Sequence, residues 1–273
     1  MRFLTGICLS LLLAPAALAG SEASPITSPD GRFAWDPGAS HVLRLNPRTG
    51  KKDRRLKLPP LVDEKTTRKV LFAEKGRYFC VVDEKHSEVG LHLKTRRGAK
   101  AAKAIIISST LHLIDDDGRI AWTRRLRDKH SLVKREGLPP QVVGNGTLAV
   151  LLEDADRAHV NPKPLLLVLD PKGKEKLRLD YLNWRRVDEF KLSPEGSYLA
   201  VRGYGRIEDE ENWDLALALY ETGSKRKIVK KARISKKGEA FESVSDDGRV
   251  CCAAVNGGRR TMDILGKLHA EQR

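Results

Sequence analysis

Short apolar runs alternate with polar turns along most of this chain, and most of the turns contain a glycine. The first example is Ser28-Pro29-Asp30-Gly31, which precedes the apolar run Phe33-Ala34-Trp35. A glycine at this position can take a positive φ, as many tight turns between antiparallel strands require. Apolar runs this short, bounded by turns, are typical of buried β-strands. The pattern therefore predicts an all-β protein.

The same turn-and-strand unit returns along the chain. Its turn glycines are Gly31, Gly76, Gly146, Gly196 and Gly248. A second kind of hairpin lies between these units, and its turn glycines are Gly50, Gly118, Gly173 and Gly223. A unit of this kind that repeats every few dozen residues predicts a closed, radial β architecture.

The repeated phrase resembles the SPDG-type blades of TolB-like and WD40-like β-propellers. The match is complete at residues 28–31 and partial in the other copies. In such propellers this turn lies between strands of one blade, so the resemblance implies four-stranded blades around an axis. The hairpin that ends in Trp122 is also similar to blades of quinoprotein-type propellers.

The spacing of the first-turn glycines predicts the number of blades. Successive glycines lie 45, 70, 50 and 52 residues apart, whereas a compact four-stranded blade takes about 40–45 residues. We therefore expect a β-propeller of five blades, with an insertion in the second unit and a thin or incomplete last blade around Gly266. Residues 22–27 are a candidate strand for completing the ring, with imperfect closure. An irregular β-sandwich is the alternative fold.

The first 19 residues have the pattern of a secretory signal peptide. Arg2 precedes an apolar stretch from Ile7 to Leu18, and Ala17-Leu18-Ala19 places small residues before Gly20. The sequence predicts cleavage after Ala19, with residues 20–273 forming a single propeller domain that is secreted or periplasmic. The alternative is an uncleaved membrane anchor, although the stretch is shorter than an ordinary transmembrane span. No later apolar run approaches that length, so no transmembrane span is expected.

Three cysteines remain after cleavage, in a compartment where disulfides can form. Cys80 and Cys252 each lie four residues after a turn glycine, so they occupy equivalent positions of different blades. We expect them to be small buried residues rather than a bonded pair. Cys251 and Cys252 are adjacent, and neighbouring strand residues point to opposite faces.

The charge is strongly positive, with Lys and Arg exceeding Asp and Glu by 15. Four basic segments lie at or just after second-hairpin turns, where outermost strands are expected: 51–57, 124–129, 172–180 and 225–237. One interpretation is a basic rim that binds a polyanion such as an acidic envelope polymer or anionic lipid headgroups, with Lys225, Arg226, Lys227, Lys230 and Lys231 as its contacts. The other is protection of exposed sheet edges. Aromatic residues are sparse there, so nucleic acid is not an expected partner.

The sequence contains no recognisable catalytic signature. The seven histidines show no paired metal-ligand spacing. Asp115-Asp116-Asp117-Gly118 lacks the alternating ligands of a calcium loop, so a polar hairpin turn is the better interpretation. We assign no catalytic residue, metal ligand or cofactor.

Three long connections between second and third strands, roughly 84–104, 154–164 and 203–214, are expected to emerge as loops on one face. Loops on a rigid scaffold often carry binding sites. The third connection combines aromatic, cationic and anionic residues, and we expect Tyr204, Arg206, Glu208 and Trp213 to contact a ligand.

Two function classes follow from these observations. The first is an exported, non-catalytic propeller that binds a protein or an anionic envelope polymer. The second is an exported propeller enzyme, either a hydrolase, a lyase or a quinoprotein-like enzyme, whose residues come from several blades.

Overall fold

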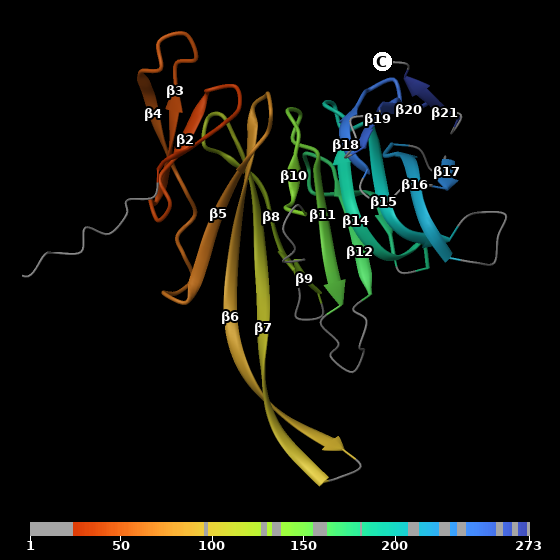
Figure 1. Cartoon of the computed structure of the whole chain (residues 1–273). Coiled ribbons are helices and arrows are strands. Elements are labelled where there is room, and N and C mark those ends of the chain that lie inside the picture. The colour runs from red at the N-terminus through yellow and green to blue at the C-terminus, as the bar shows by residue number, and fades with distance from the viewer. Residues whose placement is uncertain are drawn as a thin grey trace, which may run out of the picture.

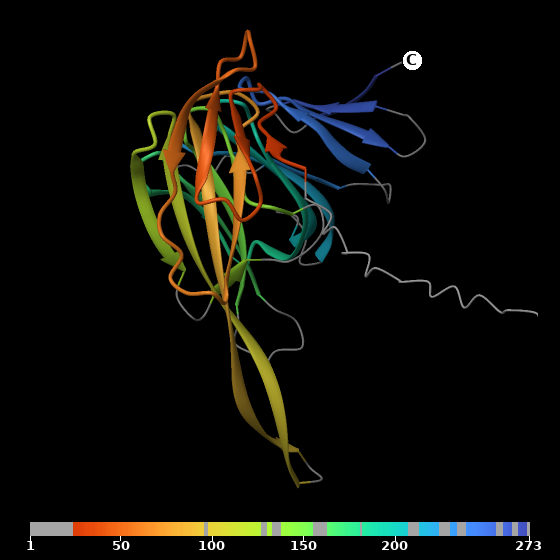
Figure 2. The same cartoon turned by 90° about the vertical axis from the view of Figure 1, so that its left-hand side faces the viewer.

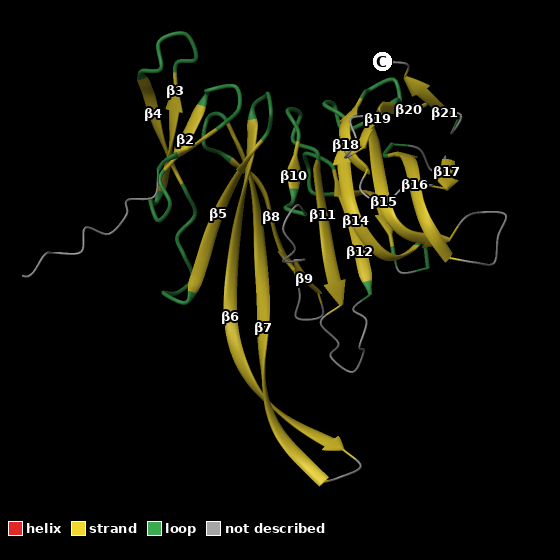
Figure 3. Ribbon diagram, viewed as in Figure 1, coloured by secondary structure: helices red, strands yellow, loops and turns green. Residues whose placement is uncertain are grey.

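The computed structural model describes residues 24–95, 98–126, 130–132, 138–154, 163–180, 182–206, 213–223, 230–233, 239–254, 259–263 and 267–271. Within these ranges all regular elements are β-strands, as Figure 3 shows. The strands form five antiparallel sheets, here called A to E, which follow one another along the chain and lie side by side in that order (Figure 1). The prediction of an all-β protein is confirmed.

The sheets contain the following strands. Sheet A has β1 (Ile26–Thr27), β2 (Phe33–Trp35), β3 (His41–Leu45) and β4 (Lys52–Lys57). Sheet B has β5 (Thr66–Phe72), β6 (Tyr78–Thr95), β7 (Gly98–Asp115) and β8 (Ile120–Leu126). Sheet C has β9 (His130–Leu132), β10 (Gln141–Val142), β11 (Leu148–Asp154), β12 (Pro164–Leu169) and β13 (Glu175–Leu179). Sheet D has β14 (Trp184–Leu192), β15 (Tyr198–Arg206), β16 (Trp213–Glu221) and β17 (Lys230–Arg233). Sheet E has β18 (Glu239–Val244), β19 (Val250–Ala254), β20 (Arg259–Met262) and β21 (Leu268–Glu271).

The repeated glycines lie in the predicted turns. All five first-turn glycines have positive φ values, from +67° at Gly196 to +129° at Gly76. Two details differ from expectation. The last sheet has four strands and is not thin, because the residues after Asp263 are enough for β21. Strand β1 pairs with β2 inside sheet A, so residues 26–27 belong to the first sheet.

Each sheet packs on the next through its own apolar cluster. Sheets A and B meet around Phe33, Phe72 and Phe79, whose ring centroids lie 5.4–6.0 Å apart. Sheets C and D share a cluster in which the Trp184 Nε1–H donates to the Tyr220 hydroxyl at 2.8 Å. Two further clusters join B to C and D to E. The core is therefore a row of inter-sheet layers, and sheets B, C and D each contribute buried residues to a cluster on either face.

The first turns of consecutive sheets are hydrogen-bonded to one another. From A to B the link is Arg32 Nη1 to the Gly76 carbonyl at 3.3 Å, and from B to C it is Arg77 N to the Gly144 carbonyl at 3.3 Å. Two more links complete the series: Asn145 Nδ2 to the Glu195 carbonyl at 2.6 Å, and Glu195 N to Asp246 Oδ1 at 2.9 Å. The turn motif thus reverses the chain within each hairpin, and its hydrogen bonds also attach that hairpin to the next sheet.

Side chains also protect the inner edges of two sheets. Gln141, on β10, donates to the Phe190 carbonyl at 2.7 Å and accepts from the Leu192 N–H at 3.1 Å, both on β14. Glu189, on β14, accepts from the Phe241 N–H of β18 at 2.9 Å. Backbone groups at these strand edges are thereby satisfied by the preceding sheet.

The expected loop at 84–104 is wrong, because this segment is mainly strand. Strands β6 and β7 stay paired from Tyr78↔Asp115 to Thr95↔Gly98. Their pairing with β5 ends at Lys85 and with β8 at Ser109. Beyond this point β6 and β7 continue as a two-stranded ribbon, residues 86–95 and 98–107, which projects away from the body in both views (Figures 1 and 2). We call this segment the ribbon.

The cysteines lie as the sequence indicated. Cys80 is buried between sheets B and C, and Cys252 is buried between D and E. Cys251, on the opposite face of β19, is partly exposed. Among the described cysteines none forms a disulfide, and the prediction that Cys80 and Cys252 do not form a bonded pair is confirmed.

Candidate functional site

The predicted ligand-binding residues lie at the end of the β15–β16 hairpin. Tyr204 is half-buried and pairs in register with Leu215, and Arg206 pairs with Trp213 at the last position of the hairpin. Glu208 lies outside the described residues. The two strands reach further than expected into the predicted 203–214 loop, because β15 continues to Arg206 and β16 begins at Trp213. The structure brings Arg206 and Trp213 into one register pair, and their role as ligand contacts stays a prediction.

The basic segments coincide with the outermost strands. The outer edges of sheets A to D are β4, β8, β13 and β17, and these strands overlap the four segments found in the sequence. Lys230 and Lys231 lie in β17, whereas Lys225, Arg226 and Lys227 lie outside the described residues. Some of the outer arginines hold neighbouring sheets together, because Arg124 of β8 donates to Glu175 of β13 at 2.6 Å. Edge protection and polyanion binding both fit this arrangement.

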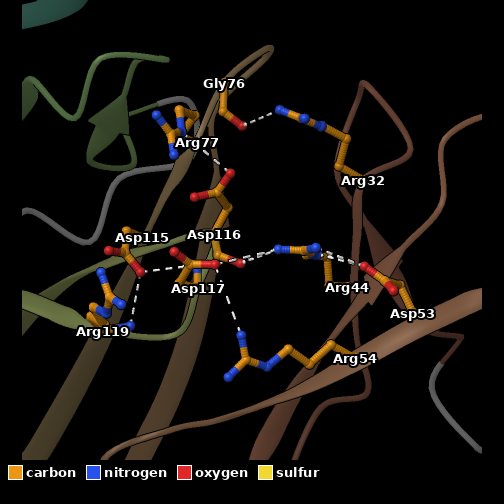
Figure 4. A network of polar contacts seen from close by, with 10 residues as sticks. All are labelled: Arg32, Arg44, Asp53, Arg54, Gly76, Arg77, Asp115, Asp116, Asp117 and Arg119. Carbon is orange, nitrogen blue, oxygen red and sulfur yellow. Dashed lines mark hydrogen bonds and ion pairs between the residues drawn. The ribbon is translucent and has the colours of Figure 1, made fainter.

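A network of arginines and aspartates joins sheets A and B next to their turns (Figure 4). The turn between β7 and β8 is shaped by Asp115, whose Oδ1 accepts from the N–H groups of Asp117 and Arg119 at 3.0 and 2.8 Å. This confirms the polar turn predicted for residues 115–118. From the same turn, the Asp116 carbonyl and the Asp117 carboxylate meet arginines of sheet A, whereas the Asp116 carboxylate pairs with Arg77 of sheet B.

Arg44 of β3 is the centre of this network. Its Nε donates to Asp53 Oδ2 at 2.8 Å, and its Nη1 donates to the Asp116 carbonyl at 3.0 Å. Arg54 lies 3.8 Å from Asp117, and Arg77 lies 3.3 Å from Asp116. The groups are partly or fully exposed, so solvent screens each ion pair.

A cleft of about 240 Å³ opens beside this network. It is lined by Arg32, Phe33, Arg44, Leu45, Asn46, Pro47, Asp53 and Asp116. Ligand pockets are usually larger and mostly apolar, at about 300–1,000 Å³. Here the charged groups of Arg44 and Asp53 are engaged with each other. The arrangement therefore serves to connect sheets A and B through ion pairs and hydrogen bonds.

A second set of polar side chains extends across sheet B from β5 at one edge to β8 at the other. Asp83 of β6 accepts two hydrogen bonds from Arg68 of β5, both at 2.6 Å, and lies 3.4 Å from His112 Nε2 of β7. The other ring nitrogen of His112 lies 2.9 Å from the Thr123 hydroxyl of β8. The Arg68 and Asp83 side chains are only 6% and 4% exposed. We call these four residues the buried row, although Thr123, at its end on the outer strand, is exposed.

The environment of Asp83 explains its charge state. Burial alone would raise its pKa, but the hydrogen bonds from Arg68 and His112 and the charge of Arg68 outweigh this effect. The pKa of Asp83 therefore lies below its ordinary value. The order carboxylate, imidazole and hydroxyl is that of a hydrolytic triad. Because Arg68 already engages both oxygens of Asp83, the carboxylate is less available to stabilise a protonated His112.

Sequence reasoning missed both the buried row and the ribbon. The signal for the row was a polar residue inside an apolar run: Asp83 follows Val81-Val82, and His112 lies between Leu111 and Leu113. The signal for the ribbon was the alternation at Val89, Leu91 and Leu93. Among the residues that the structure describes, no group of three or more His, Cys, Asp or Glu side chains is arranged to hold a metal ion. The same residues include no helix able to span a membrane.

Comparisons with known proteins found similarity to solved structures only. No family model matches the chain, and no curated protein matches its sequence. Among solved structures, Porphyromonas gingivalis dipeptidyl peptidase 4 matches with a TM-score of 0.50 and 14% identity, over 90% of this chain. Kuenenia stuttgartiensis hydrazine synthase matches with a TM-score of 0.37 and 11% identity, over 88% of this chain and 76% of its own.

The chain spans 38% of the length of the peptidase chain that it matches. At this level of identity the likeness concerns the fold alone. Together with the four-stranded antiparallel sheets, it shows that the chain has a β-propeller-like, all-β fold.

Proposed function

We propose that this chain is an exported five-bladed β-propeller of the SPDG type, with imperfect closure, that binds a protein or an anionic envelope component without catalysing a reaction. Support for the blades comes from the five consecutive sheets and from the hydrogen bonds that connect their first turns. Support for export comes from the signal-like pattern of residues 1–19. N-terminal sequencing of the exported protein should find Gly20 first, and an intact Met1 would contradict export by cleavage.

The ribbon is the observation that carries the binding function. It adds ten register pairs, from His86↔Ile107 to Thr95↔Gly98, beyond the last pairs with β5 and β8. Ten strand residues span about 33 Å. A two-stranded ribbon is at best marginally stable alone in water, so a binding role explains why the chain keeps one.

The long hairpins open on one side of the molecule. The first turns join β5 to β6 and β14 to β15, so the connections of β6 to β7 and of β15 to β16 lie at the opposite strand ends. This places the ribbon and the hairpin of Arg206 and Trp213 on the side away from the first turns. The proposed binding surface therefore includes Tyr204, Arg206, Glu208 and Trp213 as secondary contacts.

A propeller hydrolase is the second candidate, and the buried row is the observation that favours it. Thr123 would be the nucleophile and His112 the base. The double hydrogen bond from Arg68 to Asp83 weighs against this role, so binding is the better-supported function. Hydrolysis of a simple aryl ester that Thr123→Val abolishes, while the thermal midpoint is retained, would favour the enzyme.

Site-specific photocrosslinking tests the binding function. A benzophenone amino acid at Leu93 of the ribbon is compared with one at Leu182, whose side chain is 63% exposed on the body. We expect an adduct with an envelope component from position 93 and none from position 182. Adducts from position 182 alone would move the binding surface to the body.

A further inference from the structure

The outer strands of sheets A to D differ in how strongly they are charged. An outer strand has one row of backbone N–H and C=O groups that no neighbouring strand pairs with, and charged side chains on it discourage the addition of a further strand. Charged residues take five of the six positions in β4, three of the five in β13 and three of the four in β17. In β8 only two of the seven positions are charged, Arg124 and Arg125. The edge of sheet B is therefore the longest of these four edges and the least charged.

The outer side of β8 is open among the described strands. Sheet B has the order β5-β6-β7-β8, and no described strand pairs with β8 on the side away from β7. In Figure 2 this strand lies at the left margin of the body. A register shift lies near its start, and from Trp122 to Leu126 it then pairs residue by residue with Leu113 to Ser109 of β7. This stretch is regular enough to pair with another strand on its outer side.

The side chains of β8 have different surroundings on its two faces. Trp122 packs on the cluster between sheets B and C, and Arg124 donates to Glu175 of sheet C at 2.6 Å. Arg125 points to the opposite face, because neighbouring strand residues alternate. It is exposed and makes no ion pair with a described residue. Since Ile120 at the start of the strand is 50% exposed, the edge presents a guanidinium and an aliphatic side chain to a partner.

The charge around this edge favours an acidic partner. Arg119 is exposed in the turn before β8, and Lys172 and Lys174 are exposed in the β12–β13 turn, against which β8 packs. Glu175, at the start of β13, is already paired with Arg124. The whole chain is strongly positive, so a second copy would bring charges of the same sign together. An acidic segment of another protein is therefore a better match for the edge than a second copy.

We propose that the outer edge of β8 binds an extended, acidic segment of another protein, which adds to sheet B as a further strand. Main-chain hydrogen bonds to the open edge supply the affinity, and ion pairing with Arg125 and its basic surroundings supplies the selectivity. This is a second interaction surface, on the body of the molecule, and it does not depend on the function proposed for the ribbon.

Peptide selection and hydrogen exchange test the proposal with the mature protein. Random heptapeptides displayed on phage are selected against it, and we expect enrichment of Asp and Glu together with β-branched residues, which favour strands. The most enriched peptide should slow amide exchange in β8 by roughly tenfold or more and leave exchange in β4, the outer strand of sheet A, unchanged. Failure to enrich any peptide, or protection only outside β8, would overturn the proposal.

A matched pair of variants tests the role of charge. Arg125→Glu reverses the exposed guanidinium of β8, and Arg55→Glu makes the same change on β4, where Arg55 is also exposed. Fluorescence anisotropy with the labelled peptide should show a dissociation constant that rises roughly tenfold or more in the first variant and less than about twofold in the second. No loss from Arg125→Glu, or equal losses from both variants, would overturn the role of this edge. Each variant's thermal midpoint shows that the protein is folded.

Backbone methylation of the selected peptide tests strand addition itself. Alternate N–H groups of a strand point to the same side, so methyl groups on the odd or on the even nitrogens block opposite sides of the peptide. One methylation pattern should abolish binding to the protein, because it removes the N–H groups that face β8, and the other should retain binding. Equal effects of the two patterns would overturn strand addition.

Sedimentation and crosslinking distinguish this surface from other occupants and from the ribbon. If the protein alone is a dimer in which the β8 amides are already protected, a second copy occupies the edge and the proposal is overturned. If position 93 of the ribbon crosslinks to a partner but no peptide protects β8, the function of the ribbon stands and this proposal is overturned. If a peptide protects β8 while the ribbon forms no adduct, this proposal stands and the function of the ribbon fails.

Discussion

Strands β6 and β7 contain two regions with the same pairing and opposite surroundings. In the sheet half, residues 78–85 and 108–115, the strands are flanked by β5 and β8 and covered on both faces by clusters shared with sheets A and C. In the ribbon half the same two strands pair with each other alone among the described strands. The comparison separates the part that stabilises this protein from the part that we propose binds a partner. Substitutions in the sheet half should lower the free energy of unfolding strongly, and substitutions in the ribbon half should change it little.

The largest effect is expected where two first turns touch. In Gly76→Ala the new Cβ would lie 2.2 Å from the Gly144 Cα, and φ at this position is +129°. Both the overlap and the backbone strain should lower the free energy of unfolding by about 3–5 kcal/mol. Urea denaturation measures this loss in the free energy of unfolding. The control is Gly90→Ala in the ribbon, expected within about 0.5 kcal/mol of wild type. Equal midpoints for the two variants would refute the close contact between turns.

Asp83→Asn tests the buried row in the sheet half. Removing the carboxylate charge leaves Arg68 buried without its counterion, at an expected cost of about 3–4 kcal/mol at pH 7. The control is Glu88→Gln, five residues further along β6 in the ribbon, with little expected change. A loss as small as that of the control would show that the row contributes nothing to stability.

The same variant should alter the response to acid. The pKa of Asp83 in the folded state lies below its ordinary value of 3.8, so the folded protein binds this proton less readily than the unfolded one. The stabilisation is complete above pH 3.8 and is lost as the pH falls through the lower, folded-state pKa. Acid titration followed by circular dichroism should show this part of the transition in the wild type and not in Asp83→Asn.

Gln141→Leu should have an intermediate effect, about 1–3 kcal/mol, because it leaves the Phe190 carbonyl and the Leu192 N–H without their partners. Gln141→Glu keeps the acceptor for Leu192 and should cost less. Thermal unfolding compares the two. A larger loss in the Glu variant would mean that burial of charge, and not the missing hydrogen bonds, dominates this position.

Cysteine labelling compares the two regions without changing stability. Burial raises the pKa of Cys80 to about 12, with a contribution from the Asp83 charge, and the residue is 0% exposed. Native Cys80 should react with a maleimide roughly a hundredfold more slowly than the partly exposed Cys251. Val89→Cys, on the same strand in the ribbon, should react quickly. Fast labelling of native Cys80 would show that the sheet half opens.

The smallest effect on stability is expected from removing the ribbon. Joining Lys85 to Ser108 through Asn-Gly, a hairpin turn sequence, should change the unfolding free energy by less than about 1 kcal/mol. The deletion keeps every described member of the two clusters that pack on sheet B. Urea denaturation of this variant measures the change. A loss of several kcal/mol would place the ribbon inside the cooperative unit of the body.

Much of the fold was predictable because the signals were local. Gly31, Gly76 and Gly248 indicate turns, because they have positive φ values, which glycine adopts more easily than other residues. The basic segments marked the outer strands correctly, since strand edges that face solvent favour charge. The length of β6 and β7 was missed because lysines and alanines in the ribbon weaken the strand pattern.

The candidate site was less predictable than the fold. Arg68, Asp83 and His112 are distant in the sequence and meet only because β5, β6 and β7 pair in one register. No single-strand pattern contains that register. The residues proposed from the third connection, Tyr204 and Trp213, were found by local composition, and only their place on a hairpin end is now established.

The sequence by itself determined that this protein is built from β-hairpins with glycine turns, because turn conformation and strand burial depend on a few neighbouring residues. Tertiary structure decided what those hairpins contact. It set the links between first turns, assembled the buried row and, among the described strands, left one half of the β6–β7 hairpin without a third strand paired to it. These features depend on which sheets lie side by side and on strand register. Both are set by the packing of the whole chain, which no short segment contains.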